Sequence, residues 1–163
     1  MRFWIFLVPL LLISCLGQRS IDGVLDMHNQ ETVPYIKVPE LVKSEGYALL
    51  DTRKREEYEV SHLKNAHWVG NDQFNLEEVT ALFPNKDTAI VVYCSIGVRS
   101  EDIGEKLQDA GYTNVKNLYG GIFEWKNKGY PVLDPRGNKT EKVHAYNTYW
   151  GRLLTNADKV YSP

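Results

Sequence analysis

Short apolar runs alternate with segments of helical periodicity through the middle of the chain. The apolar runs predict strands at residues 35–38, 47–50, 66–69, 88–93 and 115–119. Helices are predicted at residues 39–44, 55–60, 76–83, 98–108 and 122–128. The run at 88–93 is apolar on both faces, which is typical of a central parallel strand. This alternation predicts an α/β domain with a mostly parallel central sheet of about five strands and helices on both faces.

The chain begins with a segment typical of a secretory signal peptide. Arg2 precedes an apolar run at residues 3–13, which is shorter than the roughly 20 residues that cross a bilayer. The sequence Leu12-Ile13-Ser14-Cys15 resembles the bacterial lipobox, in which the cysteine receives lipid. We therefore expect a lipoprotein held in the periplasm by lipid on Cys15, with an ordinary signal peptide as the alternative. Leu16, and not an aspartate, follows the cysteine, which favours the outer membrane.

Four regions are expected along the chain. Residues 1–14 form the signal peptide, residues 15–33 a tether, residues 34–133 the domain, and residues 134–163 a C-terminal tail packed on that domain. The length of 163 residues corresponds to about one domain, and the pattern along the chain shows no internal repeat.

The C-terminal tail is rich in aromatic residues. It opens with a loop at residues 134–140 and includes a predicted helix around residues 147–154. We expect Tyr146, Tyr149 and Trp150 to clamp the tail onto the domain by burying aromatic surface. A binding surface made by the same three residues is the alternative.

Composition limits the functions open to this domain. The 163 residues carry a formal net charge of −2, whereas nucleic-acid binding calls for a basic face, so we expect no nucleic-acid partner. Two cysteines are too few for a disulfide-rich scaffold or a four-cysteine zinc site. If Cys15 carries lipid, Cys94 is a lone thiol in an oxidising compartment. Such a thiol is a liability unless it has a function.

Cys94 stands where α/β proteins build their active sites. The run at 88–93 leads straight into the cysteine, and a glycine-containing loop and a helix follow. Backbone amides at a helix start lack intrahelical partners and stabilise an anion such as a thiolate. Gly97 lets the loop curl, and Arg99 adds a positive charge able to hold an oxyanion. The alternative interpretation is that Cys94 is a buried, inert core residue. The expected substrate cradle consists of Ser95, Ile96, Gly97, Val98, Arg99 and Ser100.

Two segments of the chain resemble one known family. Residues 91–132, which begin VVYCSIGVRS, are similar to the second half of a single-domain rhodanese, the thiosulfate sulfurtransferase family. Residues 49–69, which begin LLDTR, resemble the strand and Asp-x-Arg segment of its first half. Ser61, Lys64 and Asn65 depart from the family pattern in a turn away from the cysteine loop. We expect that turn to survive, because Asn65 tolerates a left-handed conformation.

The resemblance implies a sulfurtransferase that needs no cofactor. Cys94 would take a sulfane sulfur from thiosulfate or a related small anion as a persulfide, and pass it to a small thiol, cyanide or a thiol protein. The family pattern also implies that Asp51 lines the cleft. Arg53 would tie the following segment by an ion pair, with Glu57 as its expected partner. Arg53, Glu57 and His62 are therefore expected to be structural.

Other functions stay open at this point. Cysteine phosphatases and arsenate reductases share a cysteine–arginine cradle, but the related phosphatases place five residues between the two, and four residues separate Cys94 from Arg99. A non-catalytic rhodanese-like module for binding or redox sensing is the second alternative, which the aromatic tail keeps open. His28, His67 and His144 show no ligand spacing, so we expect no metal site.

Overall fold

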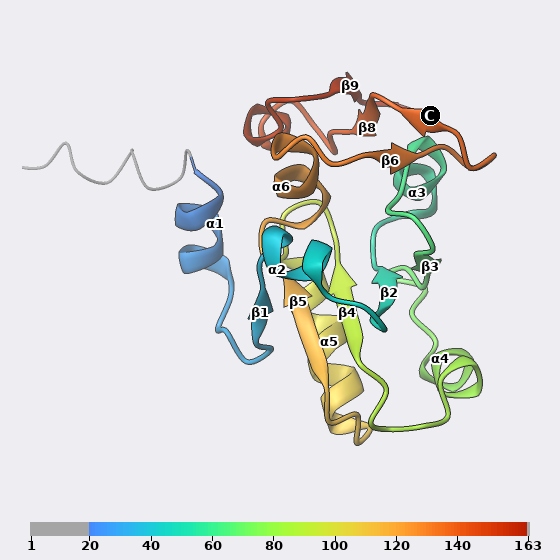
Figure 1. The fold of residues 1–163 in the computed structure, drawn as a ribbon. Coiled ribbons are helices and arrows are strands. Elements are labelled where there is room, and N and C mark those ends of the chain that lie inside the picture. The colour runs from blue at the N-terminus through green and yellow to red at the C-terminus, as the bar shows by residue number, and fades with distance from the viewer. Residues whose placement is uncertain (1–19, 163) are drawn as a thin grey trace, which may run out of the picture.

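The protein is an α/β domain built on a five-stranded parallel sheet. A computed structural model describes residues 20–162, so the expected signal peptide and Cys15 lie outside the described residues. The strands lie in the spatial order β1-β5-β4-β2-β3, and each neighbouring pair is parallel (Figure 1). Their bounds are Tyr35–Ile36 for β1, Ala48–Asp51 for β2, His67–Trp68 for β3, Ile90–Tyr93 for β4 and Val115–Leu118 for β5.

Four helices connect these strands and a fifth, α6, follows β5, as the hydrophobic pattern predicts. They are α2 (Val38–Lys43), α3 (Arg55–Val60), α4 (Leu76–Leu82), α5 (Arg99–Asp109) and α6 (Gly121–Asn127). Strand and helix bounds differ from the predicted ones by two residues at most. Apolar spacing predicts these helices because α2, α4, α5 and α6 each bury apolar side chains in the domain.

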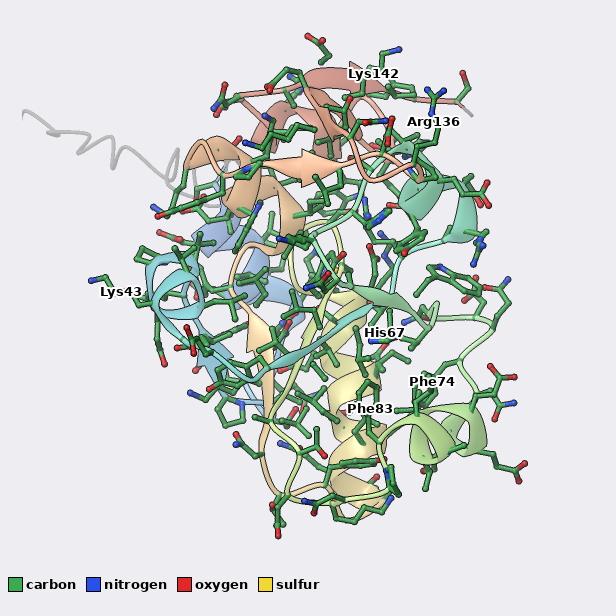
Figure 2. The ribbon with its side chains drawn as sticks, turned by 45° about the vertical axis from the view of Figure 1, so that its right-hand side comes forward. Lys43, His67, Phe74, Phe83, Arg136 and Lys142 are labelled. Carbon is green, nitrogen blue, oxygen red and sulfur yellow. The ribbon has the colours of Figure 1, made fainter. Side chains whose placement is uncertain are left out.

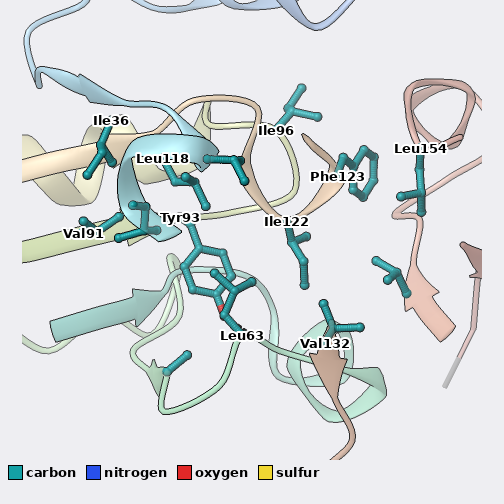
Figure 3. Close-up of a cluster of buried hydrophobic side chains, with 14 of the residues drawn as sticks. Ile36, Leu63, Val91, Tyr93, Ile96, Leu118, Ile122, Phe123, Val132 and Leu154 are labelled. Carbon is teal, nitrogen blue, oxygen red and sulfur yellow. Dashed lines mark hydrogen bonds between the residues drawn. The ribbon is translucent and has the colours of Figure 1, made fainter. Parts of the chain in front are cut away.

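Hydrophobic side chains pack on both faces of the sheet, with β4 at the centre. Ile90 and Val92 point into a core that includes Ile103 and Leu107 of α5. Val91 and Tyr93 point to the opposite face, because successive strand residues alternate. Around Tyr93 this second core gathers Ile36, Leu63, Ile96, Leu118, Ile122, Phe123, Val132 and Leu154 (Figure 3). All four β4 residues are buried, which confirms the central position predicted from their apolar run.

An N-terminal helix occupies part of the segment expected to be a tether. Helix α1 (Ile21–His28) begins after Ser20, whose Oγ accepts a hydrogen bond of 3.1 Å from the amide of Gly23. Val24 and Leu25 are buried in the domain. Residues 20–33 of this segment are therefore structured and pack on the domain, because the apolar face of α1 is covered by tertiary contacts.

The C-terminal tail covers the carboxyl end of the sheet (Figure 1). Strands β6 (Val132–Leu133) and β7 (Lys139–Thr140) form an antiparallel hairpin, so the predicted loop at 134–140 ends two residues earlier than expected. Strands β8 (Lys142–His144) and β9 (Asp158–Val160) pair in parallel. The predicted tail helix is shorter than expected, a 3₁₀ turn named η2 (Trp150–Leu153).

Charged side chains project from the surface of the domain, and the turn expected at Asn65 forms. Lys43, Arg136 and Lys142 are exposed and project from the domain (Figure 2). Asn65 has a φ of 61°, which confirms the left-handed turn expected at this position. Across residues 20–162, none of the helices has the length and apolar character needed to span a bilayer.

Candidate active site around Cys94

The cysteine loop places the thiol of Cys94 against a backbone amide. Cys94 follows the last residue of β4, and only 1% of its surface is exposed. The amide of Gly97 donates a hydrogen bond of 3.1 Å to Cys94 Sγ. Gly97 has a φ of 107°, a conformation that L side chains rarely adopt. The loop therefore curls around the sulfur as predicted, and it directs an N–H group at the atom that would carry negative charge.

Two asparagines fix the other side of Gly97. The side-chain amides of Asn117 and Asn29 donate to the Gly97 carbonyl oxygen at 2.8 and 2.9 Å. Ser100 Oγ donates to Asn117 Oδ1 at 2.8 Å, and Ser100 is fully buried. The Ser100 hydroxyl therefore supports the loop through Asn117, and Ser100 does not line the pocket around Cys94.

Helix α6 holds the carbonyl groups of the loop away from the thiol. The amides of Ile122 and Phe123 donate to the carbonyl oxygens of Cys94 and Ser95, each at 3.0 Å. These bonds require Gly121, because a Cβ atom there would lie 2.7 Å from the carbonyl carbon and oxygen of Ser95. Because α6 binds these two carbonyl groups, the loop has N–H groups available to bind an anion.

Arg99 is paired inside the protein. Its Nη1 and Nη2 donate to Glu57 Oε2 and Oε1 at 2.7 and 2.9 Å, and Nη2 also donates to Ser95 Oγ at 2.9 Å. Glu57 is fully buried and accepts further bonds from Ser95 Oγ and the amide of Lys54, both at 3.0 Å. Arg99 was expected to hold an oxyanion, but a bidentate carboxylate already balances its charge.

The buried position of Glu57 makes this pair a strong one. Burial by itself raises the pKa of the Glu57 carboxyl group, but the hydrogen bonds and charge of Arg99, with the charge of Arg53, outweigh it and lower the pKa to about 2. Glu57 is therefore ionised at neutral pH. Sequence reasoning assigned it a structural role, and the structure agrees but gives it Arg99 as partner in place of Arg53.

Asp51 and Arg53 form a second buried pair next to the site. Arg53 Nη2 lies 2.6 Å from Asp51 Oδ2, and Arg53 Nε lies 2.9 Å from Asp51 Oδ1. Arg53 Nη2 also donates to the carbonyl oxygen of Ser61 at 2.6 Å. This bond fixes the segment that follows Arg53, as the sequence predicted. Asp51 was expected to line the cleft. That expectation is wrong, because Asp51 is fully buried and its carboxylate is paired with the Arg53 guanidinium.

His62 has a structural position, as predicted. Its ring stacks on Tyr58 with a centroid distance of 4.0 Å, and its backbone pairs with Leu133. The rings of His67 and Phe83 meet edge to face, with centroids 5.3 Å apart (Figure 2). Within residues 20–162, no three His, Cys, Asp or Glu side chains gather in a way that would hold a metal ion.

A pocket of about 140 Å³ lies directly above the thiol. It brings together the predicted Cys94, Ser95, Ile96, Val98 and Arg99 with three residues that the sequence did not place there. Those three are His28 at the end of α1, and Tyr146 and Trp150 of the tail. Tyr146 and Tyr149 are 39% and 48% exposed, so they do not clamp the tail by burial, whereas Trp150 packs against the hydrophobic core as expected. In the sequence, only the aromatic residues of the tail indicated a wall of this pocket. Nothing in the sequence indicated that His28 would join it.

The fold and this loop define a class: a parallel α/β domain with an amide-cradled cysteine at the carboxyl end of its central strand. The chain belongs to the rhodanese-like domain family, whose model matches residues 37–128, more than half of its length. His28, Tyr146 and Trp150 lie outside the matched residues.

Known proteins support this assignment. The tRNA uridine(34) hydroxylase of Hamiltonella defensa is 34% identical over 123 residues, which cover 68% of this chain and 35% of that protein. The chain therefore spans about a third of the curated relatives that it matches. A rhodanese-related protein of Thermoplasma volcanium superposes with a TM-score of 0.54 and 28% identity, over 61% of this chain and 97% of that one. A thiosulfate sulfurtransferase of Pseudomonas aeruginosa shares the fold, with a TM-score of 0.58 and 21% identity, over 75% of this chain and 23% of that one.

Proposed function

We propose that the protein is a sulfurtransferase that works through a persulfide on Cys94. The observation that carries the proposal is the hydrogen bond from the Gly97 amide to Cys94 Sγ at the floor of a substrate-sized pocket. A backbone donor in that position stabilises negative charge on the sulfur before and after transfer. The membership in the rhodanese-like domain family supports the same chemistry.

The reaction consists of two half-reactions. The Cys94 thiolate attacks the sulfane sulfur of the donor, so an S–S bond forms to Sγ and the donor's own bond to that sulfur breaks. The electron pair leaves with the rest of the donor, as sulfite when the donor is thiosulfate. A thiol or cyanide then attacks the outer sulfur of the persulfide and returns the Cys94 thiolate. Ping-pong kinetics follow, and no redox cofactor is consumed.

Two other activities fit the site less well. A phosphatase of this type uses its arginine to hold a tetrahedral oxyanion, whereas Arg99 is engaged by Glu57 and Ser95. The hydroxylation of tRNA belongs to relatives about three times the aligned length, and a formal net charge of −2 does not favour a tRNA partner. A purely binding module has no need of a thiol held against an amide.

Mass spectrometry of the intact protein tests the sulfurtransferase proposal. After incubation with a sulfane-sulfur donor, the wild-type mass is expected to rise by one sulfur atom, and cyanide or a reductant should remove it. The Cys94→Ser variant should fold and show no such rise, because a hydroxyl is a far weaker nucleophile than a thiolate. An unchanged wild-type mass with every donor tried would overturn the proposal.

We further propose that lipid on Cys15 anchors the domain to a bacterial membrane on its periplasmic side, with the outer membrane favoured. The lipobox-like sequence before Cys15 supports this proposal. Metabolic labelling with a fatty acid should mark the wild type, and the Cys15→Ala variant should stay unlabelled. Equal labelling of the two would show that Cys15 is not the site of lipidation.

A further inference from the structure

Two segments from outside the rhodanese-like region complete the wall of the active-site pocket. His28 comes from the end of α1, while Tyr146 and Trp150 come from the tail. The His28 and Trp150 rings meet edge to face, with centroids 6.1 Å apart. This contact joins the N-terminal helix to the C-terminal tail at the pocket that Cys94 also lines.

Both segments are fixed on the domain. On the α1 side, Val24 and Leu25 are buried and Asn29 donates to the Gly97 carbonyl. On the tail side, Leu154 is fully buried and Asn127 Nδ2 donates to the Leu153 carbonyl oxygen at 2.8 Å. The aromatic wall is therefore a built part of the pocket and not a loose cover.

The charges around the pocket disfavour a doubly charged donor. Arg99 is the cationic residue among those that line the pocket, and Glu57 balances its charge at 2.7 Å. A thiosulfate dianion would meet the Cys94 thiolate there without a free counter-charge from the described lining residues, and it would give up hydration on entering. An uncharged organic group loses little hydration free energy when it moves from water into the pocket.

The size and chemistry of the wall indicate what it accepts. Ile96 and Val98 supply aliphatic surface, and Tyr146 and Trp150 supply aromatic surface. An apolar cavity of about 150 Å³ holds a benzene molecule, and this pocket measures about 140 Å³. Flat aromatic walls favour a ring because ring pairs gain energy beyond the area that they bury.

We infer that the pocket selects a donor whose sulfane sulfur is attached to an uncharged, ring-sized organic group, with His28, Tyr146 and Trp150 as the specificity-determining residues. This inference rests on the proposed sulfur transfer. For an organic thiosulfonate, the Cys94 thiolate bonds to the sulfane sulfur, the sulfur–sulfur bond of the donor breaks, and a sulfinate leaves with the electron pair. For an organic persulfide the leaving group is a thiolate, and the outer sulfur keeps its proton. Neither route needs an oxidant or a reductant.

Benzenethiosulfonate and methanethiosulfonate test the inference, since they carry the same charge and reacting group and differ in the ring. Thiosulfate serves as the third donor. We would measure kcat/KM for each with the full-length chain at pH 8, using cyanide as the acceptor. The Trp150→Ala variant is expected to lower kcat/KM for benzenethiosulfonate at least tenfold. The values for methanethiosulfonate and thiosulfate should change less than threefold. The ratio of kcat/KM between variant and wild type is taken for each donor separately, so the intrinsic reactivity of that donor cancels.

Tyr149→Ala is the matched control. The Tyr149 ring is 48% exposed and packs edge to face on Trp150 with centroids 4.9 Å apart, but it does not line the pocket. The variant therefore removes an aromatic ring from the same part of the tail without removing a pocket wall. It should leave all three values within threefold of wild type. A loss in Trp150→Ala that is equal for all three donors would overturn the inference, and so would a wild-type enzyme that does not favour the benzene compound over the methane compound. The wild-type comparison holds even if a variant fails to fold.

The two proposals fail in different ways. If none of the three donors adds a sulfur atom to Cys94, the sulfurtransferase proposal is wrong. If thiosulfate loads Cys94 and the ring gives no advantage, sulfur transfer stands and the inference about the donor is wrong.

Discussion

Gly121 lies directly against the main chain of Cys94. A Cβ atom at Gly121 would overlap the carbonyl oxygen of Cys94, and Gly121 has a φ of 54°. This close approach lets the amide of Ile122 donate to that carbonyl at 3.0 Å. The reactive loop is therefore shaped from both sides: Gly97 curls it around the sulfur, and Gly121 lets α6 hold its carbonyls.

Gly121→Ala is expected to damage the site severely. The new methyl group meets backbone atoms of Cys94 and Ser95, which cannot move aside as a flexible side chain would. Sulfur loading of Cys94 should fall at least tenfold, and the thermal midpoint should drop by several degrees. Gly129→Ala is the matched control, because Gly129 also has a positive φ, 83°, but has no atom within 4 Å of the added Cβ. Equal losses in the two variants would mean that backbone strain alone, and not the contact with Cys94, is responsible.

Arg99→Ala is expected to act mainly on stability. The substitution leaves the carboxylate of Glu57 buried without its charged partner, which costs about 3–5 kcal/mol in comparable pairs. The double variant Arg99→Ala/Glu57→Gln should recover part of that loss, because it removes the buried charge. Urea unfolding at pH 7 measures both effects. Strictly additive losses from the two substitutions would show that the ion pair is not what holds this region.

The same pair predicts how stability depends on pH. The carboxyl group of Glu57 has its pKa lowered from 4.5 to about 2, so the folded protein binds fewer protons there than the unfolded chain. Its contribution is complete above about pH 4.5 and is lost as the pH falls toward 2. We expect the stability difference between wild type and Glu57→Gln to shrink by about 3 kcal/mol between pH 6 and pH 2. Urea unfolding at several pH values follows this change, and a constant difference would contradict it.

A glycine inserted between Gly97 and Val98 tests the size of the cradle. It makes the spacing from Cys94 to Arg99 five residues, as in the related phosphatases. The longer loop should lift the Gly97 amide away from Sγ, and one charge-assisted hydrogen bond is worth about 1.5–3 kcal/mol. Sulfur transfer from thiosulfate should therefore fall at least tenfold, as measured by thiocyanate formation. If a folded insertion variant keeps full activity, cradle size does not select the reaction.

The hydrophobic pattern determined most of the fold. The apolar run at 88–93 leads straight into Cys94, and this order alone places the cysteine at the carboxyl end of a buried strand. Glycine at position 97 likewise indicates a loop that curls, since a side chain there would be strained. These features are local along the chain, so their physical causes are visible in the sequence.

Tertiary structure alone decided which side chains meet. Glu57 lies 42 residues before Arg99, and no spacing rule shows that Glu57 and not Asp51 would bind that arginine. His28 reaches the pocket only because α1 buries Val24 and Leu25, and Trp150 reaches it only because the tail folds back over the sheet. Burial and charge pairing act between residues that are distant in sequence and close in space. The sequence therefore predicted the nucleophile and its loop, and the packing of the two chain ends decided the walls around them.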